Sequence, residues 1–285
     1  MICNSTRHIL ILAALSWPAL SAAQPPRPAT PVAVAAPQPS YADLADLALA
    51  APTAAHVRLR RAIPLRPEES AGVAAGHSRF YMEAEVVALI RGAPGTPALV
   101  KYLADVPNQA DGRAQRPPRR SEYLVFARPV PGRADELQLV TPTAQLPFAA
   151  GTADLARSII RDALAPDAPA AISGIGRAFH VPGVLQGASE TQFFLLTSTN
   201  QPISLTVLRA PGEQPRWSVS TSEFVDAGAT QPVRDTLLWY RLACFLPEQL
   251  PRSSMSETPE HAAAINADYR LIRQGLGQCN RTRSR

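Results

Sequence analysis

Residues 79–91 carry the pattern that most restricts the fold, because their apolar side chains recur at every second position. A period of two is the repeat of an extended strand whose two faces meet different surroundings. The opposite face starts with Glu83 and Glu85 and becomes apolar at Val87 and Leu89. We therefore predict a long strand with one face in a core. That apolar face holds Phe80, Met82, Ala84, Val86, Ala88 and Ile90.

Other strand-like segments follow one another through short turns. Two strands joined by a short turn pair antiparallel, so mostly antiparallel pairing is expected. Strands do not alternate with helices of about 12 residues, which argues against a doubly wound parallel sheet. We predict an α+β fold over residues 41–280, arranged either as two lobes, 41–165 and 166–280, or as a single curved sheet. The other expected strands cover 55–63, 98–106, 122–130, 136–142, 191–198, 203–209 and 216–225.

Two helical patterns lie before residue 170. Residues 151–166 predict a mid-chain helix with Thr152 as its N-cap and Pro166 as its end. Residues 41–50 repeat leucine between acidic residues, which suits a short surface helix or turn. The mid-chain helix therefore separates the two runs of expected strands.

The C-terminal part of the chain predicts a pair of helices. The first is expected over residues 232–246, and the second over residues 258–276. The second helix has its apolar residues at offsets of four, seven and eleven, which places them on one face. Those residues are Ile265, Tyr269, Ile272 and Leu276.

The first 23 residues have the layout of an export signal. Arg7 and His8 precede the apolar run Ile9–Leu15, and Ser21 and Ala23 supply small residues before a cleavage site. The apolar run is too short for a bilayer, which takes about 20 apolar residues. Residues 1–23 are therefore predicted to be a signal peptide cleaved near Ala23.

Two further segments are predicted to be disordered. Residues 24–40 are rich in Pro and Ala and predict a spacer, and residues 281–285 predict a short tail. No later segment is apolar over the length of a membrane helix, so none is expected in the mature chain. We expect a periplasmic or secreted protein.

Cys244 and Cys279 are the two cysteines that stay after Cys3 leaves with the signal peptide. An even number of cysteines in an oxidising compartment predicts a disulfide, here one that links the two C-terminal helices. Two buried free thiols are the alternative. A catalytic cysteine needs a neighbour that lowers its pKa, and Cys244 lies in an apolar segment instead. No His or Cys stands near either cysteine at metal-ligand spacing, so no metal is expected.

The glycine-rich segment before residue 191 holds the strongest catalytic candidates. Arg177, His180, Ser189 and Glu190 combine a titratable ring, a hydroxyl and a carboxylate within 14 residues. A relay from His180 to Ser189 or Glu190 is chemically feasible. The alternative is a histidine in a connection that simply turns. Motifs for phosphate, dinucleotide or metalloprotease chemistry are absent from the sequence, so no cofactor is predicted.

A basic loop between two expected strands holds Arg113, Arg116, Arg119 and Arg120. Clustered arginines suit an anionic envelope surface, and a solvated flexible loop is the alternative. No aromatic residues alternate with the arginines, so base stacking with nucleic acid is not expected. The formal net charge of +5 includes Arg7 of the signal peptide, and the remaining excess is modest.

Several passages carry a resemblance to uncharacterised secreted proteins of sphingomonad-type alphaproteobacteria. They are YADLADL (41–47), LIRG (89–92), FARPVPGR (126–133) with ELQLV (136–140), AFHVPG (178–183) with SETQ (189–192), and RDTLLWYRLACFLP (234–247). The resemblance covers most of residues 41–283. It implies export and the two-cysteine pattern, and it implies no activity.

Three functional hypotheses follow from these features. The leading one is an exported, non-enzymatic protein that binds or scaffolds an unknown ligand, an envelope component or another protein. The second is a hydrolase-like enzyme that uses His180 with Ser189 or Glu190. The third is a binder of anionic envelope surfaces through Arg113–Arg120.

Overall fold

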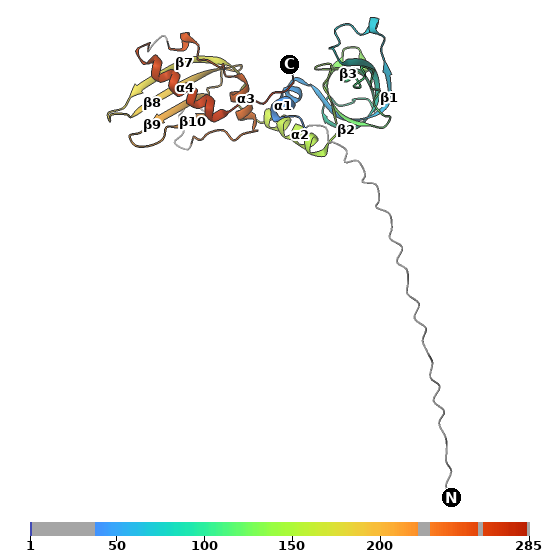
Figure 1. The fold of residues 1–285 in the computed structure, drawn as a ribbon, viewed down its shortest axis with the longest axis horizontal. Helices are drawn as coiled ribbons and strands as arrows, with labels where there is room; N and C mark the ends of the chain where they lie inside the picture. The colour runs from blue at the N-terminus through green and yellow to red at the C-terminus, as the bar shows by residue number, and fades with distance from the viewer. Residues whose placement is uncertain (2–37, 222–228, 256–258, 284–285) are drawn as a thin grey trace. The chain divides into compact units, whose positions relative to one another are not determined.

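The computed structural model describes residues 1, 38–221, 229–255 and 259–283 (Figure 1). The predicted signal peptide beyond Met1, the predicted spacer up to residue 37, and residues 222–225 of the last expected strand lie outside the described residues. The predicted α+β fold with mostly antiparallel sheets is confirmed. The strands form two sheets, one from residues 53–147 and the other from residues 172–220.

The first sheet closes into a barrel. Its strand order is β1-β2-β3-β5-β4, and β4 pairs back with β1, so no edge stays open between them. Only β3 and β5 pair in parallel, and β6 adds to β4. A five-stranded Greek-key barrel is the architecture of the OB-fold, and its ring of strands is visible in Figure 1. The strands are β1 (Thr53–Pro64), β2 (His77–Arg91), β3 (Leu99–Pro107), β4 (Glu122–Val130), β5 (Arg133–Leu139) and β6 (Gln145–Pro147).

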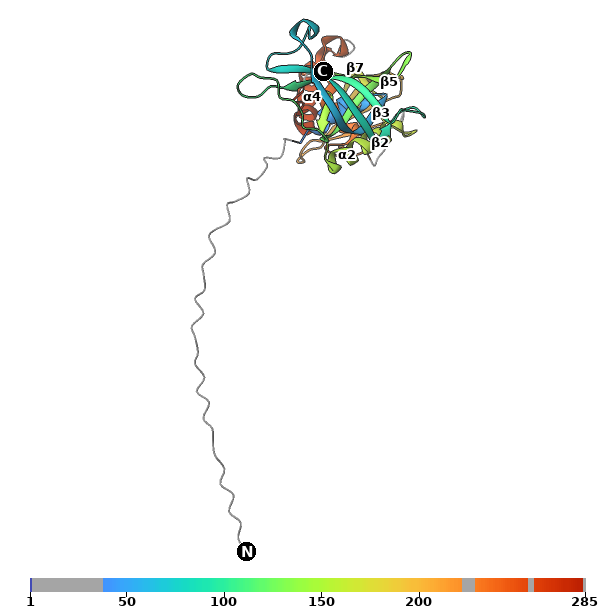
Figure 2. The same ribbon diagram turned by 90° about the vertical axis from the view of Figure 1, so that its right-hand side faces the viewer.

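The alternation predicted for residues 79–91 is present in β2. Phe80, Met82 and Ala84 are fully buried inside the barrel, whereas Val87 and Leu89 are exposed. β1 pairs with β2 along its length and with β4 through its first half, and its register to β2 shifts three times. Such irregularities bend a strand, which lets one sheet curl until it closes. The curvature is clear in the side view (Figure 2).

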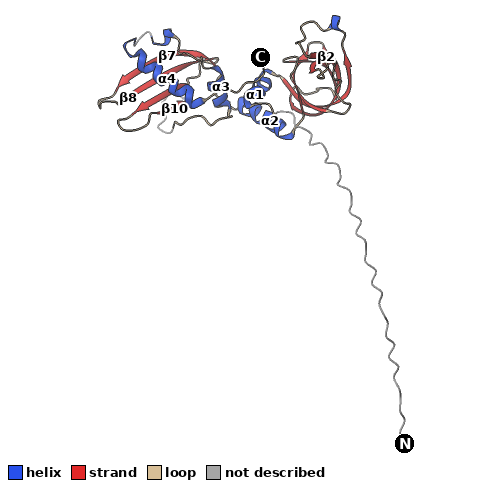
Figure 3. Ribbon diagram, viewed as in Figure 1, coloured by secondary structure: helices blue, strands red, loops and turns tan. Residues whose placement is uncertain are grey.

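The second sheet is an antiparallel meander in the order β10-β9-β8-β7. One of its faces packs against α4, as the ring centroids of Phe193 and Tyr269 at 5.7 Å show. A Cβ at Gly275 would lie 2.4 Å from Nε1 of Trp217, so only glycine permits this close approach. Figure 3 shows the helix across the strands. The elements are β7 (Ile172–Pro182), β8 (Ser189–Thr197), β9 (Ser204–Arg209), β10 (Arg216–Ser220) and α4 (Ala262–Leu276).

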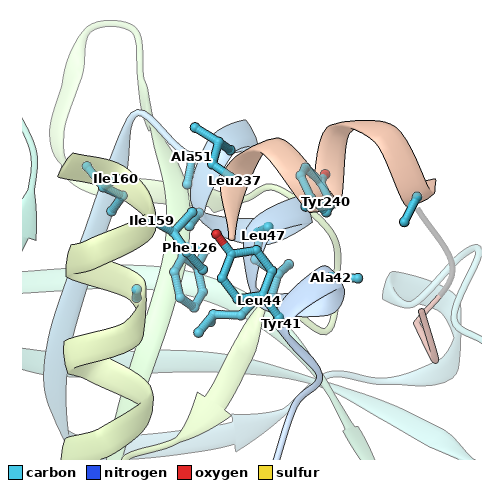
Figure 4. Packing of buried hydrophobic residues seen from close by; sticks show 14 of the residues in the cluster. Tyr41, Ala42, Leu44, Leu47, Ala51, Phe126, Ile159, Ile160, Leu237 and Tyr240 are labelled. Atoms are coloured by element: carbon cyan, nitrogen blue, oxygen red, sulfur yellow. The ribbon is translucent and has the colours of Figure 1, made fainter. Parts of the chain in front are cut away.

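The remaining helices differ from the sequence prediction in two details. α1 (Tyr41–Ala50) is buried rather than on the surface, with Leu44 and Ala45 fully enclosed. Its side chains pack toward Phe126 of β4 and Ile159 of α2 (Ala150–Leu164) (Figure 4). The α2 N-cap is Ala149, and Thr152 instead donates a hydrogen bond to Gln38 at 2.8 Å. None of the helices among the described residues has the length and apolarity to span a membrane.

The predicted disulfide is confirmed and joins the two C-terminal helices. The sulfur atoms of Cys244 and Cys279 are bonded, and their Cα atoms lie 5.0 Å apart. Cys244 belongs to α3 (Leu237–Phe245), which Thr236 caps, and Cys279 follows α4. Short 3-10 helices connect these parts at Pro67–Glu69, Arg252–Met255 and Pro259–His261.

Residues 281–283 are ordered against α1, unlike the disordered tail that the sequence predicts. The Asp43 carboxylate accepts hydrogen bonds from the backbone N–H groups of Thr282 and Arg283, both at 2.9 Å. Burial opposes the charge on Asp43, but these bonds and those from the Thr282 and Ser40 hydroxyls outweigh it and lower the pKa of the carboxyl. The prediction was wrong because polar residues in a tail can satisfy a buried carboxylate that is distant in sequence.

Candidate functional site

His180 is held by a chain of hydrogen bonds that starts at a buried carboxylate. It pairs with Thr191 across β7 and β8, and its Nδ1 lies 2.8 Å from the Thr191 hydroxyl. That hydroxyl donates its single proton to Asp268 of α4 at 2.5 Å. It must therefore accept from Nδ1–H, which leaves Nε2 of the neutral ring as a free acceptor.

The surroundings keep His180 uncharged at neutral pH. Burial is the largest cause that lowers the pKa of His180, and His261 adds to it with ring centroids 5.1 Å apart. Arg209 acts in the same direction, and Asp268 opposes them. Asp268 is 1% exposed, and its Oδ1 accepts two hydrogen bonds from the Arg209 guanidinium, at 2.8 and 2.5 Å. Burial and His261 are larger causes than Asp268, so the pKa of His180 stays below its ordinary value although Asp268 opposes them.

The structure does not make the relay that the sequence suggests. His180 and Ser189 line one pocket of about 440 Å³ with Arg209, but no hydrogen bond among the described residues joins His180 to Ser189 or Glu190. Strand alternation turns Glu190 to the other face of the sheet, where it accepts from Gln192 at 2.6 Å. The hydroxyl that is bonded to His180 belongs to Thr191, which is fully buried and donates its proton to Asp268, so it is not placed to attack a substrate. On β7, Arg177 lies over the Phe179 ring at 5.9 Å.

Thr191 and Asp268 are the members of this network that sequence reasoning missed. Thr191 pairs with His180 only through the register of β7 and β8, which includes two register shifts. Asp268 carried a usable signal, because it lies among the buried apolar residues of α4, directly before Tyr269. A carboxylate on the apolar face of a helix needs a partner when it is buried.

The basic loop is held against the barrel. The backbone N–H of Arg120 donates to the Leu59 carbonyl at 2.9 Å, and Arg119 Nε lies 3.4 Å from the Arg60 carbonyl oxygen. Pro117 is buried within this otherwise exposed loop. Arg119 and Arg120, at the end of the loop, therefore lie next to β1, which carries the exposed Arg60 and Arg61. We call the group Arg60, Arg61, Arg113, Arg116, Arg119 and Arg120 the arginine surface.

A largely apolar cavity of about 580 Å³ lies among α1, α2, α3 and the start of β7. It brings together residues that are up to 240 positions apart, because Asp43 and Arg283 both line it. Pockets of this size hold small molecules, and apolar walls with a few polar groups are typical of them. The apolar lining consists of Leu47, Leu49, Val140, Leu164, Ile172 and Phe245.

The two carboxylates of this cavity are already satisfied. Asp43 is bound by residues 282–283, and Asp46 accepts from Arg281 at 2.5 Å and from the Tyr240 hydroxyl at 2.6 Å. Arg283 also lines the cavity and donates to Thr143. Two further arginines, Arg91 at the end of β2 and Arg241 in α3, complete the charged lining.

A second groove, of about 710 Å³, follows β2, β3 and β5 on the barrel surface. This is a face on which OB-folds bind ligands. Its cations are paired inside the groove region: Lys101 with Asp135 at 2.6 Å, and Arg133 with Glu136 at 2.9 Å. Arg79 is likewise paired with Asp105, at 2.7 Å. The groove therefore presents fewer unused charges than the cavity beside α3.

The described part of the structure thus contains four candidate sites: an oriented histidine, the arginine surface, an apolar cavity and a barrel groove. Among the residues that the structure describes, no group of three or more His, Cys, Asp and Glu side chains is placed to hold a metal ion. The assignment of a function rests on these features alone, since no protein-family model and no curated protein matches the chain.

Proposed function

We propose that this chain is an exported, non-enzymatic binding protein of the periplasm or cell envelope. Its ligand site is the cavity among α1, α2 and α3. The observation that carries the proposal is a pocket of about 580 Å³ with mostly apolar walls. The Cys244–Cys279 disulfide supports an oxidising compartment.

The cavity is favoured over the histidine site for two reasons. The hydroxyl bonded to His180, that of Thr191, is fully buried and donates to Asp268, and the pocket that His180 lines is smaller, at about 440 Å³. The walls that α1 and α2 contribute are preformed, because both helices bury side chains in the same apolar core as the barrel strands. A preformed apolar site binds without the cost of ordering its walls.

A neutral fluorescent probe tests this proposal. N-phenyl-1-naphthylamine becomes bright in apolar surroundings, and we expect saturable binding of one molecule per chain. Ala171 lines the cavity and is exposed, so Ala171→Trp should narrow the opening with little effect on folding. We expect that variant to bind the probe at least about 10-fold more weakly, as a blocked apolar pocket loses several kcal/mol of burial.

The matched control is Ala114→Trp, which adds the same side chain in the exposed loop of residues 108–121. It should bind the probe as the unchanged protein does. If Ala171→Trp and Ala114→Trp bind equally well, the probe sits elsewhere and the cavity is not the site. If the native protein binds neither the probe nor any of the ten-carbon ligands of the next subsection, the proposed function is wrong.

The arginine surface supports a second candidate function, the binding of anionic envelope surfaces. The observation that supports this candidate is the contact of Arg119 with the Arg60 carbonyl, which brings the end of the basic loop next to the exposed arginines of β1. Replacement of Arg113, Arg116, Arg119 and Arg120 with Ala should reduce sedimentation with vesicles of phosphatidylglycerol and phosphatidylcholine at least about 10-fold. Each basic residue near such a surface contributes roughly 1 kcal/mol.

The control for this test removes four exposed arginines from other parts of the chain: Arg157, Arg161, Arg252 and Arg270. Both variants have the same net charge, so a loss confined to the loop variant identifies the arginine surface. Equal losses in the two variants would show attraction by overall charge only. If the loop variant binds the vesicles as the native protein does, this second candidate function is wrong.

A further inference from the structure

Arg241 of α3 has a buried donor without an acceptor. Its Nε is shielded from solvent and has no hydrogen-bond partner among the described residues. The same side chain lines the cavity among α1, α2 and α3. Desolvation lowers the pKa of Arg241, yet a guanidinium stays protonated in proteins. A permanent cation is therefore partly buried beside the cavity, and no carboxylate of the described residues forms an ion pair with it.

Arg91, at the end of β2, adds a second cation to the lining of the cavity. Its side chain has no ion pair or hydrogen bond with another described residue. The acidic groups of the cavity do not supply the missing charge, because Asp43 binds residues 282–283 and Asp46 binds Arg281. The lining of the cavity thus has unused positive charge and no unused negative charge among the described residues.

We propose that the cavity selects small molecules that have one anionic group on an apolar body, with Arg241 and Arg91 as the residues that bind the anionic group. This inference rests on the proposed function, because it names the ligand class of the same cavity. Arginine donates hydrogen bonds to carboxylate and phosphate oxygens, often in pairs. The leucine, valine, isoleucine and phenylalanine side chains of the lining then cover the apolar body.

Four ligands with one ten-carbon chain and different head groups test the inference by calorimetry at neutral pH. They are decanoate, decyl phosphate, decanol and decyltrimethylammonium. Decanoate or decyl phosphate should bind at least about 10-fold more tightly than decanol, since a hydrogen bond to a charged group contributes roughly 1.5–3 kcal/mol. Decyltrimethylammonium should bind more weakly than decanol. The anion that binds more tightly identifies whether the site prefers a carboxylate or a phosphate.

Variants locate the head-group site. Arg241→Gln and Arg91→Gln should each weaken the binding of the preferred anion about 10-fold or more. The affinities of both variants for decanol and N-phenyl-1-naphthylamine should stay within about 2-fold of the native values. Arg241→Lys keeps the charge without the paired donors, so its affinity for the preferred anion should lie between that of Arg241→Gln and that of the native protein. The matched control is Arg157→Gln on the exposed side of α2, which should leave the affinity for every ligand unchanged.

The outcomes separate this inference from the proposed function. Decanol that binds as tightly as both anions overturns the anion inference while the cavity stays a binding site. Unchanged anion binding by both Arg241→Gln and Arg91→Gln also overturns it. Absence of binding by every ligand and by the neutral probe contradicts the proposed function as well. Comparison of ligands on the native protein keeps the test valid if a variant does not fold.

Discussion

Replacement of Asp268 with Ala should lower the free energy of unfolding by about 3–5 kcal/mol, as expected when one partner of a buried charge network is removed. Asp268 is 1% exposed and Thr191 is fully buried. The change would leave the Thr191 hydroxyl without its acceptor and Arg209 without its counter-ion. Urea unfolding, followed by circular dichroism, measures the effect.

The control for this prediction is Asp154→Ala in α2. Asp154 also pairs with an arginine, Arg157, at 2.6 Å, but its side chain is 72% exposed. Exposed pairs contribute about 0–1 kcal/mol, so this variant should unfold almost as the native protein does. A loss of less than about 1 kcal/mol in Asp268→Ala would show that the network contributes little to folding.

A readout specific to the network comes from His180. Thr191→Val removes the acceptor of Nδ1–H but keeps the shape of the side chain. Its expected signature is a change in the tautomer of the His180 ring, visible in the ring nitrogen shifts by NMR. A ring that keeps Nδ1–H in this variant would contradict the orientation that we infer from the hydrogen-bond chain.

Replacement of both Cys244 and Cys279 with Ser should cost roughly 3–4 kcal/mol of unfolding free energy. The disulfide closes a loop with a sequence separation of 35, and the loss of chain entropy in the unfolded state accounts for this magnitude. For a chain of this size the melting temperature should fall on the order of 10 °C. Urea unfolding and thermal melts of the double variant measure both quantities.

Reduction of the native protein provides the control for the disulfide. A thiol reductant should shift the urea midpoint of the native protein to that of the double variant and leave the double variant unchanged. Non-reducing mass spectrometry should detect the peptide pair that contains Cys244 and Cys279. An identical midpoint with and without reductant would show that the bond does not stabilise the fold.

Local patterns in the chain predicted several features correctly. The alternation in β2 identified the residues that the barrel buries, because a strand in a curved sheet still presents alternate side chains to the core. The apolar face of α4 was predicted from spacing, and Ile265, Tyr269, Ile272 and Leu276 are all buried. The disulfide followed from two cysteines in a chain with a predicted export signal, without any knowledge of geometry.

The candidate site was predicted less well. His180 was identified as a residue of interest, but its partners were expected at Ser189 and Glu190 rather than at Thr191 and Asp268. The cavity beside α3 was not predicted, since Arg91 and Arg241 are 150 positions apart and carry no common motif. Spacing along the chain reports only neighbours within one element, and these groups meet across several elements.

The sequence by itself predicted most of the strands, the α+β class and the pairing of the two cysteines, because each depends on local periodicity or on composition. It did not predict β6 or β7, and the glycine-rich segment that forms β7 was expected to be a connection. Tertiary structure alone decided that β4 returns to β1 and closes the barrel, that α1 is buried, and that residues 281–283 bind Asp43. These features depend on long-range pairing and on where polar groups find partners away from water. These contacts depend on how the whole chain packs, so they cannot be predicted from any single segment of the sequence.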